Sequence, residues 1–286
     1  MATEPQAAGL PVAWRIPLLV LGLLSMLAGV GAGLQRLGWA VPLPHDSLAT
    51  VHGPLMVAAF FGTVIGLERA VALGKRWGFA APAACGLGGI ALIAGFPPVV
   101  ALTLTTGGAA LLTAVTLCAA RRQPALHTRL LSLAAALSAV AGVAWGFGAT
   151  GLAVAGWMSF LVLTIAGERL ELSRFLPPSP VARRVFVGIV ALLLFALVLT
   201  GRDDAVPGQR LFGFSLALMA LWLLRQDVAR RTARQPGLTG FIARCLLSGY
   251  VWLFSGGLLL AVQPAMPLLM DAALHAVFVG FVLAMV

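Results

Sequence analysis

The sequence predicts an all-α, polytopic transmembrane helical bundle, and its composition and apolar runs carry this prediction. Of the 286 residues, 60% are hydrophobic and 10% are charged, and the mean hydropathy is +1.01. Soluble domains carry about 25% charged residues. Apolar runs of about 20 residues, enough to cross a hydrocarbon layer of ~30 Å, recur along the whole chain. This composition excludes a secreted or cytosolic enzyme and makes the lipid bilayer the first partner that we expect.

Ten apolar runs are predicted as spans. In order they cover residues 14–35, 48–71, 78–97, 99–120, 128–147, 151–172, 183–200, 210–226, 238–262 and 267–286. Polar, proline-containing or glycine-containing segments separate them, and these read RLGWAVPLPHDS, ALGKRW, P, RRQPALH, GAT, SRFLPPSPVA, GRDDAVPGQ, DVARRTARQPG and QPAM. We therefore expect one transmembrane domain over residues 1–286, with residues 1–13 outside the membrane.

The two chain ends carry expectations of their own. The N-terminal segment lacks the basic region and the cleavage site of a signal peptide, so we expect the first run to be a retained helix. The tenth run is still apolar at Val286, with no basic or aromatic flank, so we expect the natural chain to continue.

Basic residues predict the orientation. The N-terminal segment and the even-numbered connections and span ends hold all of the 19 Lys and Arg except Arg36, Arg202 and Arg210. By the positive-inside rule the N-terminus and the even connections are cytoplasmic, and the odd connections face the outside. The net charge of +10 is therefore explained by orientation, and we expect no nucleic-acid partner. So strong an asymmetry also supports ten spans.

A weak internal repeat has a period of 100 residues. Four residues of the second run recur in the sixth, as the pairs Phe60 and Phe160, Ile65 and Ile165, Glu68 and Glu168, and Arg69 and Arg169. The tenth run would be the third member of this series, which implies units of about four helices.

Two of the four histidines fall inside spans, where ionisable groups are costly and mark candidate functional sites. His52 follows Asp46 by six residues, and His275 follows Asp271 by four. Both helices run inward from the predicted outer face, so with a rise of ~1.5 Å per residue the two imidazoles should lie at nearly the same depth. Axial ligation of one heme iron requires this arrangement. The alternative is that each imidazole only bonds a neighbouring backbone group or acid.

Other side chains near the histidines have narrower interpretations. Gly53 would let a flat ring approach, and Met56, one turn inward of His52, is either a soft ligand for copper or heme or a core residue. His45 and His127 are predicted as loop residues. Local ion pairs are expected at Glu68 and Glu168, core positions at Cys85, Cys118 and Cys245, and places in the interfacial aromatic belt for Trp14, Trp39, Trp77 and Trp157.

Two segments resemble known families. The segment ATVHGPLMVAAFFGTVIG is similar to the second helix of heme-copper oxidase subunit I, with His52 in the place of a low-spin heme ligand. The segment DAALHAVFVGFVLAM resembles the NnrS family, whose late helix carries an HAxxxG pattern that His275, Ala276 and Gly280 match. The resemblance implies twelve helices in three four-helix arcs, and heme or copper binding in nitrosative stress. No histidine occurs between His127 and His275, so the binuclear centre of the oxidases is not expected.

The functional hypothesis is a heme-binding protein of the bacterial inner membrane. His52 and His275 would ligate one heme b near the outer face for electron transfer or a nitric oxide or gas response, with a periplasmic redox partner and with copper as a further candidate. No acid–base or nucleophile set accompanies the histidines, so enzymatic and non-enzymatic roles both stay open. The alternative is a small-molecule transporter built on internal repeats. One observation opposes this alternative. Repeat units of four helices all have the same orientation in the membrane, whereas the inverted repeats of many transporters require an odd number of spans in each unit.

Overall fold

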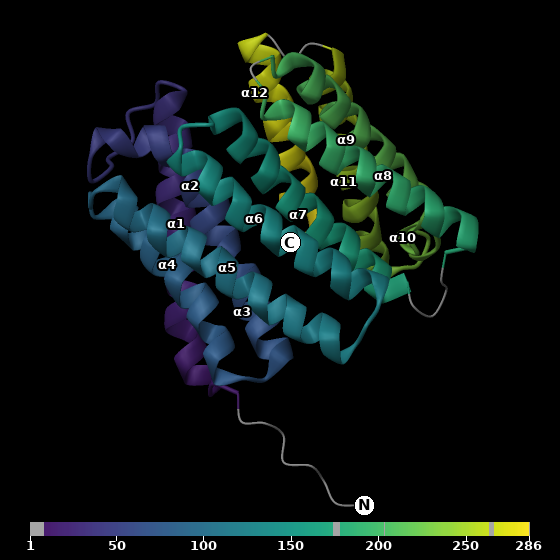
Figure 1. The fold of residues 1–286 in the computed structure, drawn as a ribbon, viewed down its shortest axis with the longest axis horizontal. Helices are drawn as coiled ribbons and strands as arrows, with labels where there is room; N and C mark the ends of the chain where they lie inside the picture. The colour runs from purple at the N-terminus through teal and green to yellow at the C-terminus, as the bar shows by residue number, and fades with distance from the viewer. Residues whose placement is uncertain (1–8, 174–177, 203, 263–265, 286) are drawn as a thin grey trace, which may run out of the picture. The chain divides into compact units, whose positions relative to one another are not determined.

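The computed structural model describes residues 9–173, 178–202, 204–262 and 266–285. They contain helices and no strand. The chain divides into two compact units, Met1–Phe160 and Leu161–Val286. Figure 1 shows the helices of both units with their labels. The single domain expected over residues 1–286 stays a prediction.

The predicted fold class is confirmed. Within the described ranges nine helices are long and apolar enough to cross a membrane, and a shorter apolar helix covers Pro267–Leu283. These ten elements begin and end within a few residues of the ten predicted runs. The protein is therefore an integral membrane protein with an all-α polytopic architecture.

The first unit contains the first five spans and the beginning of the sixth. Its second span is irregular, because a 3-10 turn, a short α-helix, a π-helix and a longer α-helix follow one another along one axis. The elements are α1 (Val12–Arg36), η1 (Asp46–Val51), α2 (His52–Pro54), η2 (Leu55–Phe61), α3 (Gly62–Leu73), η3 (Arg76–Phe79), α4 (Ala80–Ile93), α5 (Pro98–Arg122), α6 (Leu126–Gly146) and the first half of α7 (Thr150–Leu172).

The second unit begins within α7 and contains the remaining spans. Its last span also changes from an α-helix to a π-helix. The elements after α7 are α8 (Pro180–Thr200), α9 (Val206–Gln226), the short α10 (Ala229–Thr232), α11 (Gly237–Val262), α12 (Pro267–His275) and the π-helix η5 (Ala276–Leu283).

A glycine face on α1 receives the second span. Gly22, Gly29 and Gly33 are spaced by seven and four residues, so they lie on one side of the helix. A Cβ atom at Gly29 would lie 2.7 Å from Met56 Sδ, and one at Gly22 would lie 3.3 Å from Thr63 Cγ2. Small residues allow such close backbone approach in membranes, where packing and not water exclusion drives helix association.

The packing of α9 on α11 is closer still. A Cβ at Gly213 would lie 2.5 Å from both Gly257 O and Ala261 N, and one at Gly257 would lie 2.7 Å from Ala217 N. The neighbours are backbone atoms on both sides, so neither helix can yield by a side-chain rotation. This contact fixes the spacing of the two central helices of the second unit.

Three sequence expectations about side chains are settled by the packing. The Glu68 carboxylate pairs with the adjacent Arg69, as predicted for the end of the second span. Cys85 is buried and Cys118 and Cys245 are half-buried, and all three are free cysteines. Trp14, Trp39 and Trp77 are exposed, which agrees with an interfacial belt.

The only tyrosine in the chain lies in the core of the second unit. Tyr250 is buried, and its hydroxyl donates a hydrogen bond to Asp227 Oδ2. Asp227 Oδ1 in turn accepts a hydrogen bond from the backbone N–H of Ala229 at 2.9 Å. Asp227 therefore connects the end of α9, the start of α10 and the middle of α11.

We expect Tyr250→Phe to destabilise the protein by about 1–3 kcal/mol, because it leaves a carboxylate oxygen without its buried partner. The measurement is thermal unfolding in detergent. Thr103→Val, which removes an exposed hydroxyl bonded to Val99 O within α5, is the control and should change little. Equal melting of the Tyr250 variant and the wild type would contradict the assigned role of the hydrogen bond.

Candidate functional site

His52 is held against α1 at the predicted outer end of the second span. Its Nδ1 lies 2.7 Å from the carbonyl oxygen of Gly29. Since a carbonyl oxygen can only accept, Nδ1 carries the proton, and in the neutral ring the lone pair is on Nε2. A Cβ at Gly33 would lie 2.9 Å from His52 Cε1, so this glycine leaves the space that the imidazole occupies. The glycines of α1 therefore position the His52 ring, Gly29 through its carbonyl oxygen and Gly33 by leaving space.

The helix geometry changes three residues after His52. Pro54 lies in the first turn, where its missing N–H removes no helical hydrogen bond. The π-helix η2 then runs over Leu55–Phe61. Single π-helical segments within α-helices occur frequently at functional sites.

The second predicted ligand also precedes a π-helix. His275 is the last residue of α12, and the π-helix η5 begins at the next residue. Its Nδ1 lies 2.8 Å from Asp271 O and 3.4 Å from Asp271 Oδ2, so a carbonyl again requires the proton on Nδ1. The side chains of His275 and Asp271 are about half exposed, at 53% and 51%.

The two histidine-bearing hairpins also share their register. Gly33 stands 19 positions before His52, and Gly256 stands 19 positions before His275. Gly256 packs against residues that flank His275 in the chain, because a Cβ there would lie 2.8 Å from Val277 Cγ2 and 2.9 Å from Ala273 O. Both hairpins therefore place a glycine of the outgoing helix against the histidine end of the returning helix. The matching segment of the sixth span lies in a regular α-helix, and the four-helix repeat stays a prediction.

The two lesser candidates near His52 differ in what surrounds them. Met56 points its sulfur at α1, in the space above Gly29, so in the structure it packs between helices. A Cβ at Gly53 would meet no atom of the described residues within 4 Å. The face of the helix beside His52 is therefore open at Gly53.

We expect Gly33→Ala to push the His52 ring out of place, because the added methyl group would overlap Cε1 and Nδ1. Overpacking of this kind costs about 1–3 kcal/mol. The measurement is thermal unfolding in detergent against Gly107→Ala, whose Cβ would meet no described atom within 4 Å and which should be neutral or mildly stabilising. If both variants melt alike, the contact between Gly33 and His52 is looser than described.

His45 is a fully bonded structural residue. Its Nε2 lies 3.1 Å from Leu92 O and its Nδ1 lies 2.6 Å from Ser47 Oγ. Nε2 must donate to the carbonyl, so Nδ1 accepts from the serine hydroxyl. His45 fastens the loop before η1 to the end of α4, in agreement with its prediction as a loop residue near a helix start.

Two other predictions are corrected. His127 is not a solvated loop residue, because α6 begins at Leu126 and the imidazole is half-buried, with Nε2 lacking a hydrogen-bond partner among the described residues. Trp157 does not belong to an exposed aromatic belt. It is 3% exposed and its ring centroid lies 6.1 Å from that of Trp145. The reason is that α7 is the most buried of the spans, since 78% of its most apolar 18-residue stretch is buried in the protein.

Metal-ligating side chains do not cluster in the described part of the chain. No group of three or more His, Cys, Asp and Glu side chains is placed to hold a metal ion there. Heme iron needs only one or two axial protein ligands, so the histidine-bearing hairpins do not depend on such a group.

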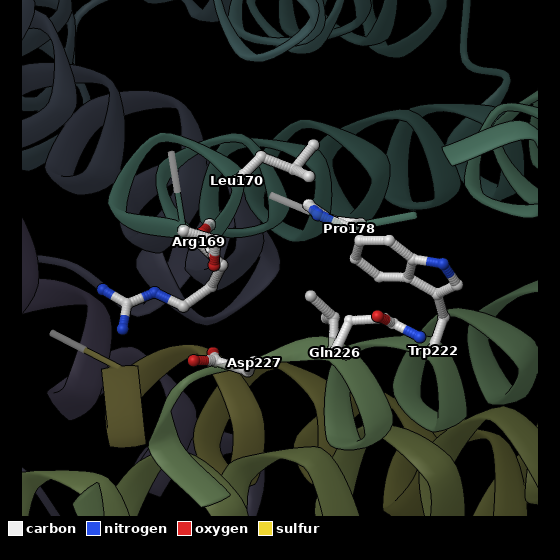
Figure 2. A pocket seen from close by; sticks show the side chains of 8 residues that line it. Arg169, Leu170, Pro178, Trp222, Gln226 and Asp227 are labelled. Carbon is white, nitrogen blue, oxygen red and sulfur yellow. Dashed lines mark hydrogen bonds between the residues drawn. The ribbon is translucent and has the colours of Figure 1, made fainter. Parts of the chain in front are cut away.

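A small cavity lies at the other end of the second unit. Figure 2 shows Arg169 and Leu170 of α7 on one side of it and Trp222, Gln226 and Asp227 at the end of α9 on the other. The Trp222 indole N–H donates to Ala182 O at 2.9 Å. Asp227, which lines the cavity, bonds Tyr250 in the middle of α11, whereas α12, which ends at His275, packs on Gly256 nearer the end of α11. The cavity could not be predicted from the sequence, because its lining comes from two spans that are separate in the chain and from the residues that follow them.

Together these features define a polytopic helical membrane protein with two similar histidine-bearing hairpins. The chain belongs to the family described as a domain of unknown function, DUF8744, whose model matches residues 15–286. Comparisons with curated proteins and with solved structures gave no match.

Proposed function

We propose that this protein binds heme b through His52 and His275 and acts in electron transfer or in the response to nitric oxide or a related gas. The observation that carries the proposal is the shared state of the two imidazoles. Each has its Nδ1 on a backbone carbonyl oxygen, at 2.7 Å for His52 and 2.8 Å for His275. Histidines that ligate metals almost always donate their other ring N–H to a carbonyl or carboxylate, which fixes the tautomer and makes Nε2 the ligating atom.

The surroundings of His52 fit a flat macrocycle. The ring is oriented by Gly29 O and packed on Gly33, and the adjacent Gly53 leaves its side of the helix open among the described residues. The neighbouring side chains of η2 are apolar, as a porphyrin requires. Bound heme would supply one-electron chemistry and a site for a diatomic gas. The histidines would hold and orient it.

The position along the helices favours exchange at the outer face. Both histidines lie at helix ends opposite the arginine-rich ends of the spans. The positive-inside rule places the arginine-rich ends in the cytoplasm and therefore the histidines near the outer face. We accordingly propose a bacterial inner membrane location and a periplasmic redox partner. Copper binding, with Met56 as a soft ligand, belongs to the same proposal. The NnrS-like and heme-copper oxidase-like resemblance supports it at the two segments that contain the histidines.

The test is the reduced-minus-oxidised absorption spectrum of the full chain purified after heme-replete expression, with iron and copper measured on the same sample. A low-spin b-type signal with iron close to stoichiometric is expected. A folded, monodisperse protein that carries no iron and shows no heme absorption overturns the proposal. In that case flux assays in proteoliposomes would test the transporter alternative.

A further inference from the structure

The arginine-rich end of the second unit carries an uncompensated positive surface. Seven arginines there are exposed, and none forms an ion pair with a carboxylate of the described residues. Three of them hydrogen-bond only to backbone carbonyl oxygens, at 3.3–3.5 Å. The seven are Arg183, Arg184, Arg225, Arg230, Arg231, Arg234 and Arg244.

The densest part of this surface is built on a fixed support. The short helix α10 carries Arg230 and Arg231, and its first residue, Ala229, is buried against Ala243 and Leu246 of α11. Asp227, bonded to both the Ala229 N–H and the Tyr250 hydroxyl, holds the beginning of α10. The Arg244 guanidinium donates to Ala233 O at 3.3 Å and holds the segment after it. The arginines of α10 are therefore presented by an anchored element.

Exposed apolar side chains follow the arginines of α10 closely in the chain. Leu238, Phe241 and Ile242, in the first turns of α11, are 71%, 58% and 49% exposed. In a membrane protein such side chains face acyl chains. Arg234 precedes them and Arg244 follows them in the chain, so cationic groups border an apolar surface at the end of a span.

We propose that α10 and the beginning of α11 form a binding site for an anionic phospholipid. Arg230, Arg231 and Arg234 would bind the headgroup phosphate, and the acyl chains would lie on Leu238, Phe241 and Ile242. Guanidinium groups match phosphate oxygens with two parallel hydrogen bonds, which an ammonium group cannot do. Each arginine near the membrane surface raises the affinity for anionic lipid about fivefold. The apolar border distinguishes a lipid from a free phosphate ion, which would gain nothing from it.

The test is a titration of the delipidated full chain in neutral detergent, read by native mass spectrometry. Phosphatidylglycerol and phosphatidylcholine with the same acyl chains are the two probes, and phosphatidylglycerol should bind at least about tenfold more tightly. The variant R230Q/R231Q/R234Q should lose this preference. The control R76Q/R121Q/R129Q removes three exposed cationic side chains from the first unit and should keep it.

Three results would overturn the proposal. Equal affinity for the two lipids would show no headgroup recognition, and equal loss in the control variant would show only a general effect of charge. Competition by soluble glycerophosphoglycerol at the concentration of the lipid would show a phosphate site without a lipid component. If the triple variant does not fold, the single variants Arg230→Gln and Arg231→Gln, each expected to weaken phosphatidylglycerol binding about fivefold, decide the matter.

Discussion

In the His52→Ala variant, the heme signal in the reduced-minus-oxidised spectrum is expected to disappear. The substitution removes the proposed ligating Nε2 together with the Nδ1–H that bonds Gly29 O. Removing only the group that hydrogen-bonds a metal-ligating histidine lowers metal affinity about 10–100-fold. Loss of the ligand itself should therefore lower the retained iron at least as much. The measurement is iron per chain with the spectrum of the same sample. His275→Ala should give the same loss if both imidazoles ligate one iron.

The matched control is His45→Ala. Both ring nitrogens of His45 are already bonded, to Leu92 O and to the Ser47 hydroxyl, so its removal should lower stability without changing the spectrum. A spectrum of His45→Ala that resembles that of His52→Ala would show that the outer loop belongs to the site and that the ligand assignment is wrong. An unchanged spectrum in His52→Ala would remove this residue from the site altogether.

The largest loss of stability is expected from Gly213→Ala. The added methyl group would meet Gly257 O and Ala261 N, both at 2.5 Å, so α9 and α11 must move apart along their whole contact. Overpacking against mobile side chains costs about 1–3 kcal/mol, and a backbone on the other side puts this variant at or above the upper end of that range. The measurement is thermal unfolding in detergent together with the monodisperse fraction after extraction.

Gly188→Ala provides the comparison within the same unit. It also lies inside a helix, α8, but a Cβ there would meet no described atom within 4 Å. The substitution should therefore be neutral or slightly stabilising, in line with the higher helix propensity of alanine. If Gly213→Ala were as stable as Gly188→Ala, the helices would be farther apart than the structure places them.

The spans could be predicted because hydropathy and charge determine them directly. Each predicted run meets a helix, since a bilayer-spanning backbone must satisfy its hydrogen bonds internally. The change to a π-helix after His52 and after His275 could not be predicted. A π-helix differs from an α-helix in which carbonyl each N–H pairs with, and not in composition, so the apolar pattern of η2 and η5 contains no signal for it.

For the candidate site, the sequence identified the two histidines but not their partners. Gly29 O and Gly33 come from another helix, and their place beside His52 depends on the register between the two spans. The glycine spacing on α1 could have indicated a packing face. The burial of Trp157 could not have been inferred, because α7 is apolar on all sides and no polar face marks which side is covered.

The pairing of Gly29 with His52 also has a consequence for biosynthesis. The two residues belong to the first two spans, so this contact can form as soon as the second span leaves the translocon. His275, in contrast, belongs to the last of the ten apolar elements and is made more than 200 residues later. A cofactor that required both histidines would therefore be inserted after translation of the spans, into a chain in which His52 has been held in place from early in its synthesis.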